Sequence, residues 1–338
     1  MGKMIQIDGT EGGGQMLRTA LSLAMITGQP FRMTNIRGKR PKPGLMRQHL
    51  TCVRAACEIS GGVADDAEIG STELVFRADQ LRGGSYRFAI GTAGSTSLLY
   101  QTLLPALLYS DAPSTLRLEG GTHNPMAPPF EFLSQVFLPA LRRMGASADL
   151  SLVETGFAPA GGGIIESAIT PCDKLTPYQL HDRGELRALK VRVPIRNLPA
   201  SIGGRILTAA TEVLPCDDAS VEIREPGPGR GVVCLVSADF GDGSELTSSL
   251  GEHGVTSEAV GHRAAKGMKH FIDSGAAVGR YLADQLLLPM ALAGGGEFTT
   301  MKPDNHVATN ISVITKFLPV NFRIDDGERG KKIISVSC

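Results

Sequence analysis

The sequence lacks the long apolar runs of a membrane protein, because no stretch reaches the roughly 18 residues that a spanning helix needs. Its N-terminus also lacks the apolar core of a secretory signal peptide. The six cysteines form no Cys-x-x-Cys pair and no metal-finger spacing, which argues against a zinc finger or a disulfide framework. We therefore expect a cytoplasmic protein with reduced thiols and no membrane partner.

Acidic residues are absent between Glu11 and Glu58, although the whole chain has a net charge of zero. The same stretch carries eight cations, namely Arg18, Arg32, Arg37, Lys39, Arg40, Lys42, Arg47 and Arg54. A field of this sign favours phosphate-rich ligands, although a solvated basic surface is the alternative explanation. Four of the cations lie in the loop 37–44 between prolines and glycines, which fits anion binding better than packing.

Three stretches of the chain resemble one another. Each opens with a glutamine, continues as an apolar run and is followed by a β-like segment; the glutamines are Gln15, Gln101 and Gln285. Such self-similarity indicates a repeat architecture. We expect an α/β (α+β) fold built from three strand-helix-strand-helix-strand-strand units, at about residues 1–85, 86–180 and 276–338. Helices are expected at residues 15–26, 44–59, 95–109, 129–144, 278–293 and 306–317.

About ninety residues between the second and third copies do not match this pattern. We expect them to form a small α/β domain over residues 184–275, inserted into the third repeat of a catalytic domain made of residues 1–183 and 276–338. The pattern predicts a strand at 189–193 and helices at 200–213 and 257–272. Residues 220–223 and 232–236 flank the turn-rich segment 226–229 and are expected to form a hairpin.

The segment from Asp8 to Gln15 joins a predicted strand to a predicted helix and contains three consecutive glycines. Glycines let a backbone approach a ligand closely, and a helix N-terminus offers free N–H groups to phosphate, although close packing explains such turns equally well. Neither the Walker pattern nor Gly-x-Gly-x-x-Gly is present. Glu11 is more informative, because a carboxylate beside bound phosphates requires a divalent cation between them.

Two histidines and one arginine are further candidates. Arg18 lies one turn into the first helix and could face the same pocket, or its stem could simply pack on the surface. His49 follows the basic loop, where a structural role is the commoner one. His306 stands at a predicted helix start, just after a loop. A neutral imidazole can attack phosphorus, and a helix N-terminus disfavours the cationic ring.

Seven motifs occur in a fixed order along the whole chain: Glu11-Gly12-Gly13-Gly14-Gln15-Met16-Leu17-Arg18, Lys42-Pro43-Gly44-Leu45-x-Arg47-Gln48-His49, Gly91-Thr92-Ala93-Gly94-Ser95, Gly120-Gly121-Thr122, Ala127-Pro128-Pro129, Tyr281-Leu282-Ala283-Asp284-Gln285 and His306-x-x-Thr309-Asn310-Ile311. Together they resemble the RNA 3′-terminal phosphate cyclase family. The resemblance implies an enzyme that uses ATP to convert an RNA 3′-phosphate to a 2′,3′-cyclic phosphodiester. It implies RNA 3′ ends and ATP as partners, and nothing in the sequence points to DNA.

The resemblance also implies a role for each matching residue. His306 would attack the α-phosphorus of ATP, and Glu11 would hold a divalent metal, Mg or Mn. The ATP-binding residues would be Gln101, Pro128, Glu131, Phe132, Tyr281, Leu282, Ala283, Asp284 and Gln285. The residues that bind phosphate or RNA would be Arg18, Arg37, Arg40, Gln48 and His49.

Two other functions stay open at this point. A non-catalytic branch of the same family works in ribosomal RNA assembly and lacks the nucleophilic histidine, whereas His306 is present here. An enolpyruvyl transferase also uses repeated α/β units, but it would have more repeats and a longer chain.

Overall fold

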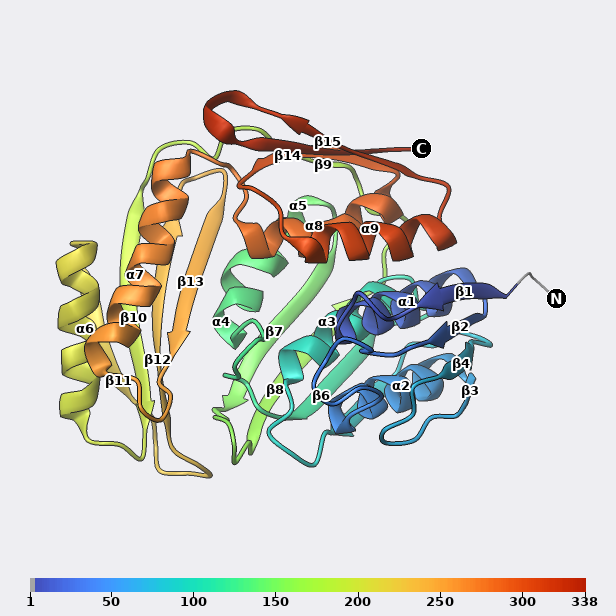
Figure 1. The fold of residues 1–338 in the computed structure, drawn as a ribbon, viewed down its shortest axis with the longest axis horizontal. Helices are drawn as coiled ribbons and strands as arrows, with labels where there is room; N and C mark the ends of the chain where they lie inside the picture. The colour runs from blue at the N-terminus through green and yellow to red at the C-terminus, as the bar shows by residue number, and fades with distance from the viewer. Residues whose placement is uncertain (1–3) are drawn as a thin grey trace.

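The computed structural model describes residues 4–338, which form a mixed α/β structure (Figure 1). The first repeat contains β1 (Ile5–Asp8), α1 (Gly14–Thr27), β2 (Phe31–Thr34), α2 (Arg47–Ser60), β3 (Val63–Asp65) and β4 (Leu74–Arg77). Its sheet has the order β1-β2-β4-β3, in which β1 is parallel to β2 and β4 is antiparallel to both of its neighbours.

The second and third repeats have sheets of the same design. The second contains β5 (Ser85–Ala89), α3 (Thr96–Leu107), β6 (Ser114–Gly120), α4 (Phe130–Phe132), a π-helical segment (Leu133–Phe137), α5 (Leu138–Arg143), β7 (Ser147–Glu154) and β8 (Gly163–Thr170). The third contains β9 (Tyr178–Leu180), α8 (Arg280–Ala293), β14 (Gly295–Thr300), α9 (Asn305–Phe317), β15 (Asn321–Asp326), a short 3₁₀ turn (Glu328–Gly330) and β16 (Lys332–Ser337). Their sheet orders are β5-β6-β8-β7 and β9-β14-β16-β15. The fold class expected from the sequence is thus confirmed.

The residues between β9 and α8 form a separate four-stranded sheet with two helices. It contains β10 (Ala188–Arg196), α6 (Ala200–Val213), β11 (Asp218–Ile223), β12 (Gly231–Asp239), β13 (Ser244–Leu250) and α7 (Ser257–Ser274), and its order is β11-β10-β12-β13. We call residues 184–275 the insert. A second hydrophobic core, centred on β10, β12 and α7, lies within it.

The predicted hairpin between residues 220–223 and 232–236 is wrong. β10 lies between these strands, because Val191 pairs with Ala219 of β11 on one side and with Val236 of β12 on the other. The crossover helix α6 returns the chain parallel to β10, and β12 then pairs with the opposite edge of β10. The apolar strand β12 thereby becomes an interior strand, paired with β10 and β13.

One predicted helix boundary is also corrected. The second helix was expected from residue 44, but α2 begins at Arg47. Gly44 has a φ of 82°, in the left-handed region, and its N–H donates to the carbonyl of Ile36 at 2.7 Å. Gly44 therefore belongs to the turn that brings the basic loop back towards β2, and Met46 is the extended residue before the helix.

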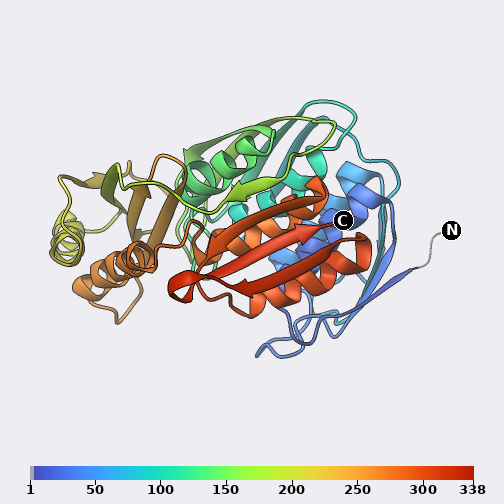
Figure 2. The ribbon, with the colours of Figure 1, turned by 90° about the horizontal axis from the view of Figure 1, so that it is seen from above.

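The helices of the three repeats face one another inside the molecule, and the repeat sheets lie outside them (Figures 1 and 2). In Figure 1 the third sheet lies across the top, with α8 and α9 beneath it. Helix α1 is central, because it packs against α2, α3 and α9 and is buried along most of its length. One continuous core joins the three repeats, and a cleft forms where it meets the insert.

Two buried arginines fasten the insert to the repeats. The guanidinium of Arg183 packs over the rings of both Phe240 and Phe271, at 4.3 and 4.5 Å from their centroids, and donates to the carbonyl of Ala276 at 2.6 Å. Arg196, at the far end of β10, donates to the carbonyl of Thr155 at 2.5 Å. The insert is thus held at both ends of β10. No helix within residues 4–338 combines the length and apolar character needed to cross a bilayer.

Candidate nucleotide and phosphate site

A cleft of about 870 Å³ lies where the three repeats meet the insert. Such a volume is within the range of small-molecule sites in proteins. Its walls come from α1, α2, α3, α8, α9, the segment 124–132 and strand β13 of the insert. The structure brings together most of the site residues predicted from the sequence: Arg18, Arg37, Arg40, Gln48, His49, Gln101, Pro128, Phe132, Tyr281, Asp284, Gln285 and His306.

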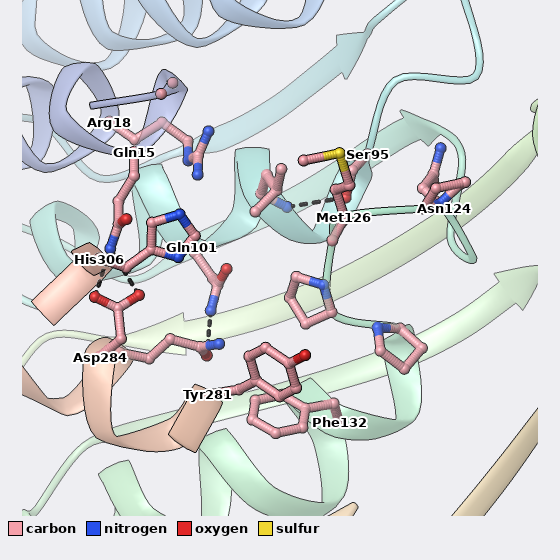
Figure 3. Close-up of a pocket in the computed structure, with 18 of the residues that line it drawn as sticks. Gln15, Arg18, Ser95, Gln101, Asn124, Met126, Phe132, Tyr281, Asp284 and His306 are labelled. Carbon is pink, nitrogen blue, oxygen red and sulfur yellow. Dashed lines mark hydrogen bonds between the residues drawn. The ribbon is translucent and has the colours of Figure 1, made fainter. Parts of the chain in front are cut away.

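His306 stands in the first turn of α9 and lines the cleft (Figure 3). Its side chain is 52% exposed, so a ligand can reach the imidazole. Asp304 caps the helix by accepting a hydrogen bond from the His306 N–H at 2.9 Å, and its other oxygen lies 3.8 Å from Nδ1. One carboxylate therefore fixes the backbone of this residue and places negative charge beside the ring.

Beside His306, a network of polar side chains joins the first and third repeats. The Gln15 amide donates to both carboxylate oxygens of Asp284, at 2.5 and 2.6 Å (Figure 3). Asn310 donates to the main-chain carbonyl of Asp284 at 3.1 Å and accepts from the Thr19 hydroxyl at 2.7 Å. Burial raises the pKa of the Asp284 carboxyl, while the hydrogen bonds and the neighbouring imidazole oppose that shift.

The amides of Gln101 and Gln285 face each other and are hydrogen-bonded across the cleft floor (Figure 3). One comes from α3 and the other from α8, and each precedes a proline within its helix by four residues. Next to them, Tyr281 is 54% exposed and Phe132 is buried. This part of the cleft thus offers aromatic surface beside amide groups, a combination suited to a flat heterocycle.

The other end of the cleft is cationic and is built around two glycines. An added Cβ at Gly13 would lie 3.1 Å from Arg40, and one at Gly14 would collide with the His49 ring and lie 3.0 Å from Arg18. The absence of side chains in this turn therefore allows the arginines and the imidazole to gather over the start of α1. Arg37 braces the basic loop by donating to the carbonyl of Gly44 at 2.8 Å.

His49 is held neutral in this environment. Burial, together with repulsion from Arg18 and Arg37, lowers the pKa of the imidazole to about 3. Its Nδ1 accepts a hydrogen bond from the backbone N–H of Met46 at 3.2 Å, which places the proton on Nε2. His49 can therefore donate a hydrogen bond into the cleft at neutral pH, but it cannot serve as a cation.

The N-terminus of α3 closes this end. Gln48 accepts a hydrogen bond from the Ser95 N–H at 3.0 Å, and the Asn124 amide donates to the carbonyl of Ala93. Ser95 itself caps α3 by accepting from the Leu98 N–H at 3.2 Å. The turn before α3 is thus tied both to α2 and to the segment that follows β6.

Four predicted site residues do not line the cleft. Tyr281, Asp284 and Gln285 share one face of α8, whereas the intervening Leu282 and Ala283 lie on the opposite face and are buried in the core. The ATP-binding role expected for Leu282 and Ala283 stays a prediction, and the structure shows only that their side chains do not line the cleft.

The other two contact basic side chains instead of lining the cleft. Glu131 turns inward to His123, with 2.9 Å between Oε2 and Nε2. Burial acts to raise the pKa of Glu131, but the interactions with His123, a backbone hydrogen bond and the charge of Arg224 together hold the pKa below its ordinary value. Glu11 is exposed and pairs with Lys39 at 2.5 Å. Among residues 4–338, no group of three or more His, Cys, Asp or Glu side chains is arranged to hold a metal.

Several residues that line the cleft had no role predicted from the sequence: Thr19, Ser95, Asn124, Met126, Ser248, Ser249, Glu252, Asp304 and Asn310. For Asp304 a signal was present, because an aspartate shortly before an apolar run is a common helix cap. For the β13 residues there was none, since that strand was not predicted.

Comparison with known proteins gives consistent matches over nearly the whole chain. A family model described as RNA 3′-terminal phosphate cyclase matches residues 9–324. The chain is similar to an RNA 3′-terminal phosphate cyclase of Ectopseudomonas mendocina (strain ymp), with 48% identity over 320 residues that cover 94% of this chain and 93% of that protein.

The chain also matches one further curated protein and one solved structure. An RNA 3′-terminal phosphate cyclase of Ralstonia nicotianae (strain ATCC BAA-1114 / GMI1000) is 47% identical over 335 residues, which cover 98% of this chain and 96% of that protein. Among solved structures, the enolpyruvyl transferase NikO from Streptomyces tendae is 14% identical and has a TM-score of 0.37, with 99% of this chain and 48% of that chain covered.

Proposed function

This chain belongs to the RNA 3′-terminal phosphate cyclase family, and from that premise we propose that it converts an RNA 3′-phosphate to a 2′,3′-cyclic phosphodiester, with ATP as co-substrate and His306 as the nucleophile. The single observation that carries the proposal is the placement of His306. An accessible imidazole shares one cleft with an aromatic surface at one end and an arginine cluster at the other.

The nucleoside of ATP fits the part of the cleft that contains Tyr281, Phe132 and Pro128. The exposed phenol ring offers a face to the adenine, and Gln285 and Asp284 offer polar groups to the base or the sugar. The volume of the cleft is large enough for a nucleotide and the end of an RNA chain together.

In the first step, a ring nitrogen of His306 attacks the α-phosphorus of ATP, a phosphorus–nitrogen bond forms, and pyrophosphate leaves. Asp304 lies beside the ring, where its negative charge stabilises the positive charge that develops on the imidazole. The pyrophosphate oxygens carry charge that Arg18 and Arg40, over the glycine turn, can neutralise.

In the second step, an oxygen of the RNA 3′-phosphate attacks the same phosphorus, and the histidine nitrogen leaves. In the third step, the neighbouring ribose 2′-OH attacks the RNA phosphorus, the ring closes, AMP departs and the hydroxyl proton passes to solvent or to a basic group. The last attack is intramolecular and gains from proximity. The neutral His49 and Gln48 offer polar groups that position the RNA phosphate without repelling it.

A divalent ion would reach this site with the triphosphate. Mg²⁺ commonly binds through one or two carboxylates together with substrate phosphates. Glu11 precedes the glycine turn and would supply one carboxylate in place of its contact with Lys39, so the described residues fit an ion shared with the nucleotide better than a site made by the protein alone. The ion would neutralise phosphate charge.

Incubation of the protein with α-labelled ATP and Mg²⁺ or Mn²⁺, without RNA, tests the proposal. We expect a covalent AMP adduct that is labile in acid, stable in alkali and located on His306 by mass spectrometry. His306→Ala should form none, whereas His270→Ala, an exposed position on α7 outside the cleft, should react like the parent. A well-folded parent protein without adduct would indicate a non-catalytic RNA-binding role, and label on another residue would reject His306 as the nucleophile.

A further inference from the structure

Two exposed large apolar side chains line the cleft, and they occupy different walls. They are Tyr281, on α8, and Met126, in the loop after β6, which is 84% exposed. The remaining exposed large apolar side chains among residues 4–338 lie elsewhere on the surface. The proposed reaction gives Tyr281 a ligand, but it leaves Met126 without one.

Met126 has a strained backbone conformation in a loop that is restrained by prolines and by a hydrogen bond. Its φ is 58°, in the left-handed region that non-glycine residues seldom adopt and that tends to persist where function requires it. Pro125 precedes it, and Pro128 and Pro129 soon follow, so the loop has few alternative conformations. Asn124, two residues before Met126, donates to the carbonyl of Ala93 in the turn that leads into α3.

A buried pair beneath the loop joins its two ends. His123 is completely buried, and its two ring nitrogens lie 2.9 Å from the Thr122 hydroxyl and 2.9 Å from Glu131. Thr122 and His123 lie at the start of the loop and Glu131 lies at its end. The contacts of the His123 ring with Thr122 and Glu131 therefore join the two ends of the loop that carries Met126.

Figure 3 shows where the loop directs this side chain. In this view Met126 lies across from His306 and Asp284, and the hydrogen bond of Asn124 to Ala93 places the loop beside the turn that leads to Ser95. Ser95 belongs to the polar group that contains Gln48, next to the arginines. Met126 is thus on the wall that the proposed mechanism leaves for the RNA phosphate.

We propose that Met126 is the platform on which the base of the 3′-terminal RNA nucleotide packs. This inference rests on the proposed function, which requires two nucleotides in one cleft and hence two apolar surfaces for bases. The thioether is polarisable and makes favourable contacts with aromatic rings. Because every base presents a π-face, such a platform tolerates any sequence at the 3′ end and favours the larger purines.

The variant Met126→Ala tests this assignment. Alanine keeps the Cβ, so the backbone strain at this position is unchanged and only the platform is removed. We expect the KM for an RNA 3′-phosphate to rise about two- to tenfold, with the rate of self-adenylation by ATP unchanged. Met126→Leu should recover part of the loss. Ile223→Ala removes an apolar side chain that is 73% exposed on β11, outside the cleft, and is the matched control.

An RNA whose last nucleotide is abasic shows whether the lost contact is with the terminal base. This substrate should have a higher KM than normal RNA with the parent protein, and Met126→Ala should raise it no further. If the abasic substrate and Met126→Ala together raise the KM by the product of their separate effects, the contact lies elsewhere on the RNA. If Met126→Ala leaves the KM for normal RNA unchanged, Met126 has no role in binding RNA. A fall in self-adenylation would assign Met126 to the ATP side instead.

Self-adenylation also separates the two proposals. If the parent protein forms no adduct with ATP, the proposed function fails. If the adduct forms normally and the RNA-dependent measurements do not respond to Met126, only the platform fails.

Discussion

The side-chain amide of Gln15 lies within hydrogen-bonding distance of both carboxylate oxygens of Asp284, at 2.5 and 2.6 Å. One residue begins helix α1 of the first repeat, and the other belongs to α8 of the third repeat. The bond therefore joins the glycine turn to the helix that carries Tyr281. This contact links the proposed phosphate end of the cleft to its proposed nucleoside end.

Gln15→Glu should destabilise the protein in a pH-dependent way. The substitution is isosteric, but it places a second carboxylate against one whose pKa burial already raises. Two such groups cannot both ionise without a large penalty, so the folded pair holds a proton that the unfolded chain releases. Stability is then retained at low pH and lost as pH rises through the folded pKa of the pair.

Urea unfolding at pH 5 and pH 8 measures the effect. We expect a loss of about 3 kcal/mol at pH 8 and a much smaller loss at pH 5. Gln80→Glu, at an exposed loop position, controls for the added charge itself. An equal loss of unfolding free energy at both pH values would mean that steric disruption, and not repulsion between the two carboxylates, destabilises the variant.

The cationic part of the candidate site could be predicted from the sequence because its residues lie close together in the chain, whereas the residues of the nucleoside end were implied by the resemblance to the cyclase family. The stretch without acidic residues that contains Arg18, Arg40 and His49 folds around one glycine turn. Its basic side chains therefore lie close together in the structure as well as in the sequence. Helices α1 and α9 were also predicted, because their apolar spacing is regular over more than three turns.

The features of the structure that were not predicted from the sequence depend on contacts between residues that are distant in the chain. The hairpin was wrong because strand pairing is decided by β10, which precedes both strands and inserts between them. The strand β9 has three residues and pairs with β14 across the whole insert. β13 has few apolar positions to reveal it. Which residues of a motif face a cleft is likewise set by helix geometry, as Leu282 and Ala283 show.

Glu245 of β13 is expected to make stability depend on pH near neutrality. Its carboxylate is buried, accepts a hydrogen bond from the Leu246 N–H at 2.9 Å and lies against Gly279, where an added Cβ would collide with it. Burial raises the pKa of Glu245 to about 7, against the opposing attraction of Arg183 and nearby N–H groups. The folded state therefore binds a proton more tightly than the unfolded chain, whose pKa stays near its ordinary value.

The stability of the parent protein should fall between about pH 4.5 and pH 7 by roughly 3 kcal/mol relative to Glu245→Gln, which has no charge to gain. Urea unfolding of both proteins across this range gives the difference directly. Glu212→Gln, at an exposed position of α6, should follow the parent curve. Parallel curves for the parent and Glu245→Gln would show that the buried carboxyl keeps the same pKa after unfolding.

Gly14→Ala should impair adenylation more than it impairs folding. A Cβ at this position would collide with the His49 imidazole and lie 3.0 Å from Arg18, so both side chains must move away from the start of α1. Gly14 is the first residue of α1, and an alanine there reduces the conformational entropy of the unfolded chain, which stabilises by roughly 0.4–1 kcal/mol and offsets part of the strain. We therefore expect the melting temperature to change little and the rate of adduct formation to fall by at least tenfold, because the triphosphate loses its preorganised partners.

Gly204→Ala supplies the matched comparison, because Gly204 lies in helix α6 and has no neighbour within 4 Å of an added Cβ. That variant should gain stability from the same restriction of the unfolded chain and should form the adduct at the parent rate. If Gly14→Ala instead retains the parent rate, the contact of His49 and Arg18 with the glycine turn is not what holds the phosphates. If Gly14→Ala fails to fold, the packing role of the glycines outweighs their role in ligand access.

The KM for ATP, measured separately from the maximal rate, distinguishes displaced phosphate contacts from a displaced nucleophile. His306 stands on a different helix from Gly14 and should be unaffected by the substitution.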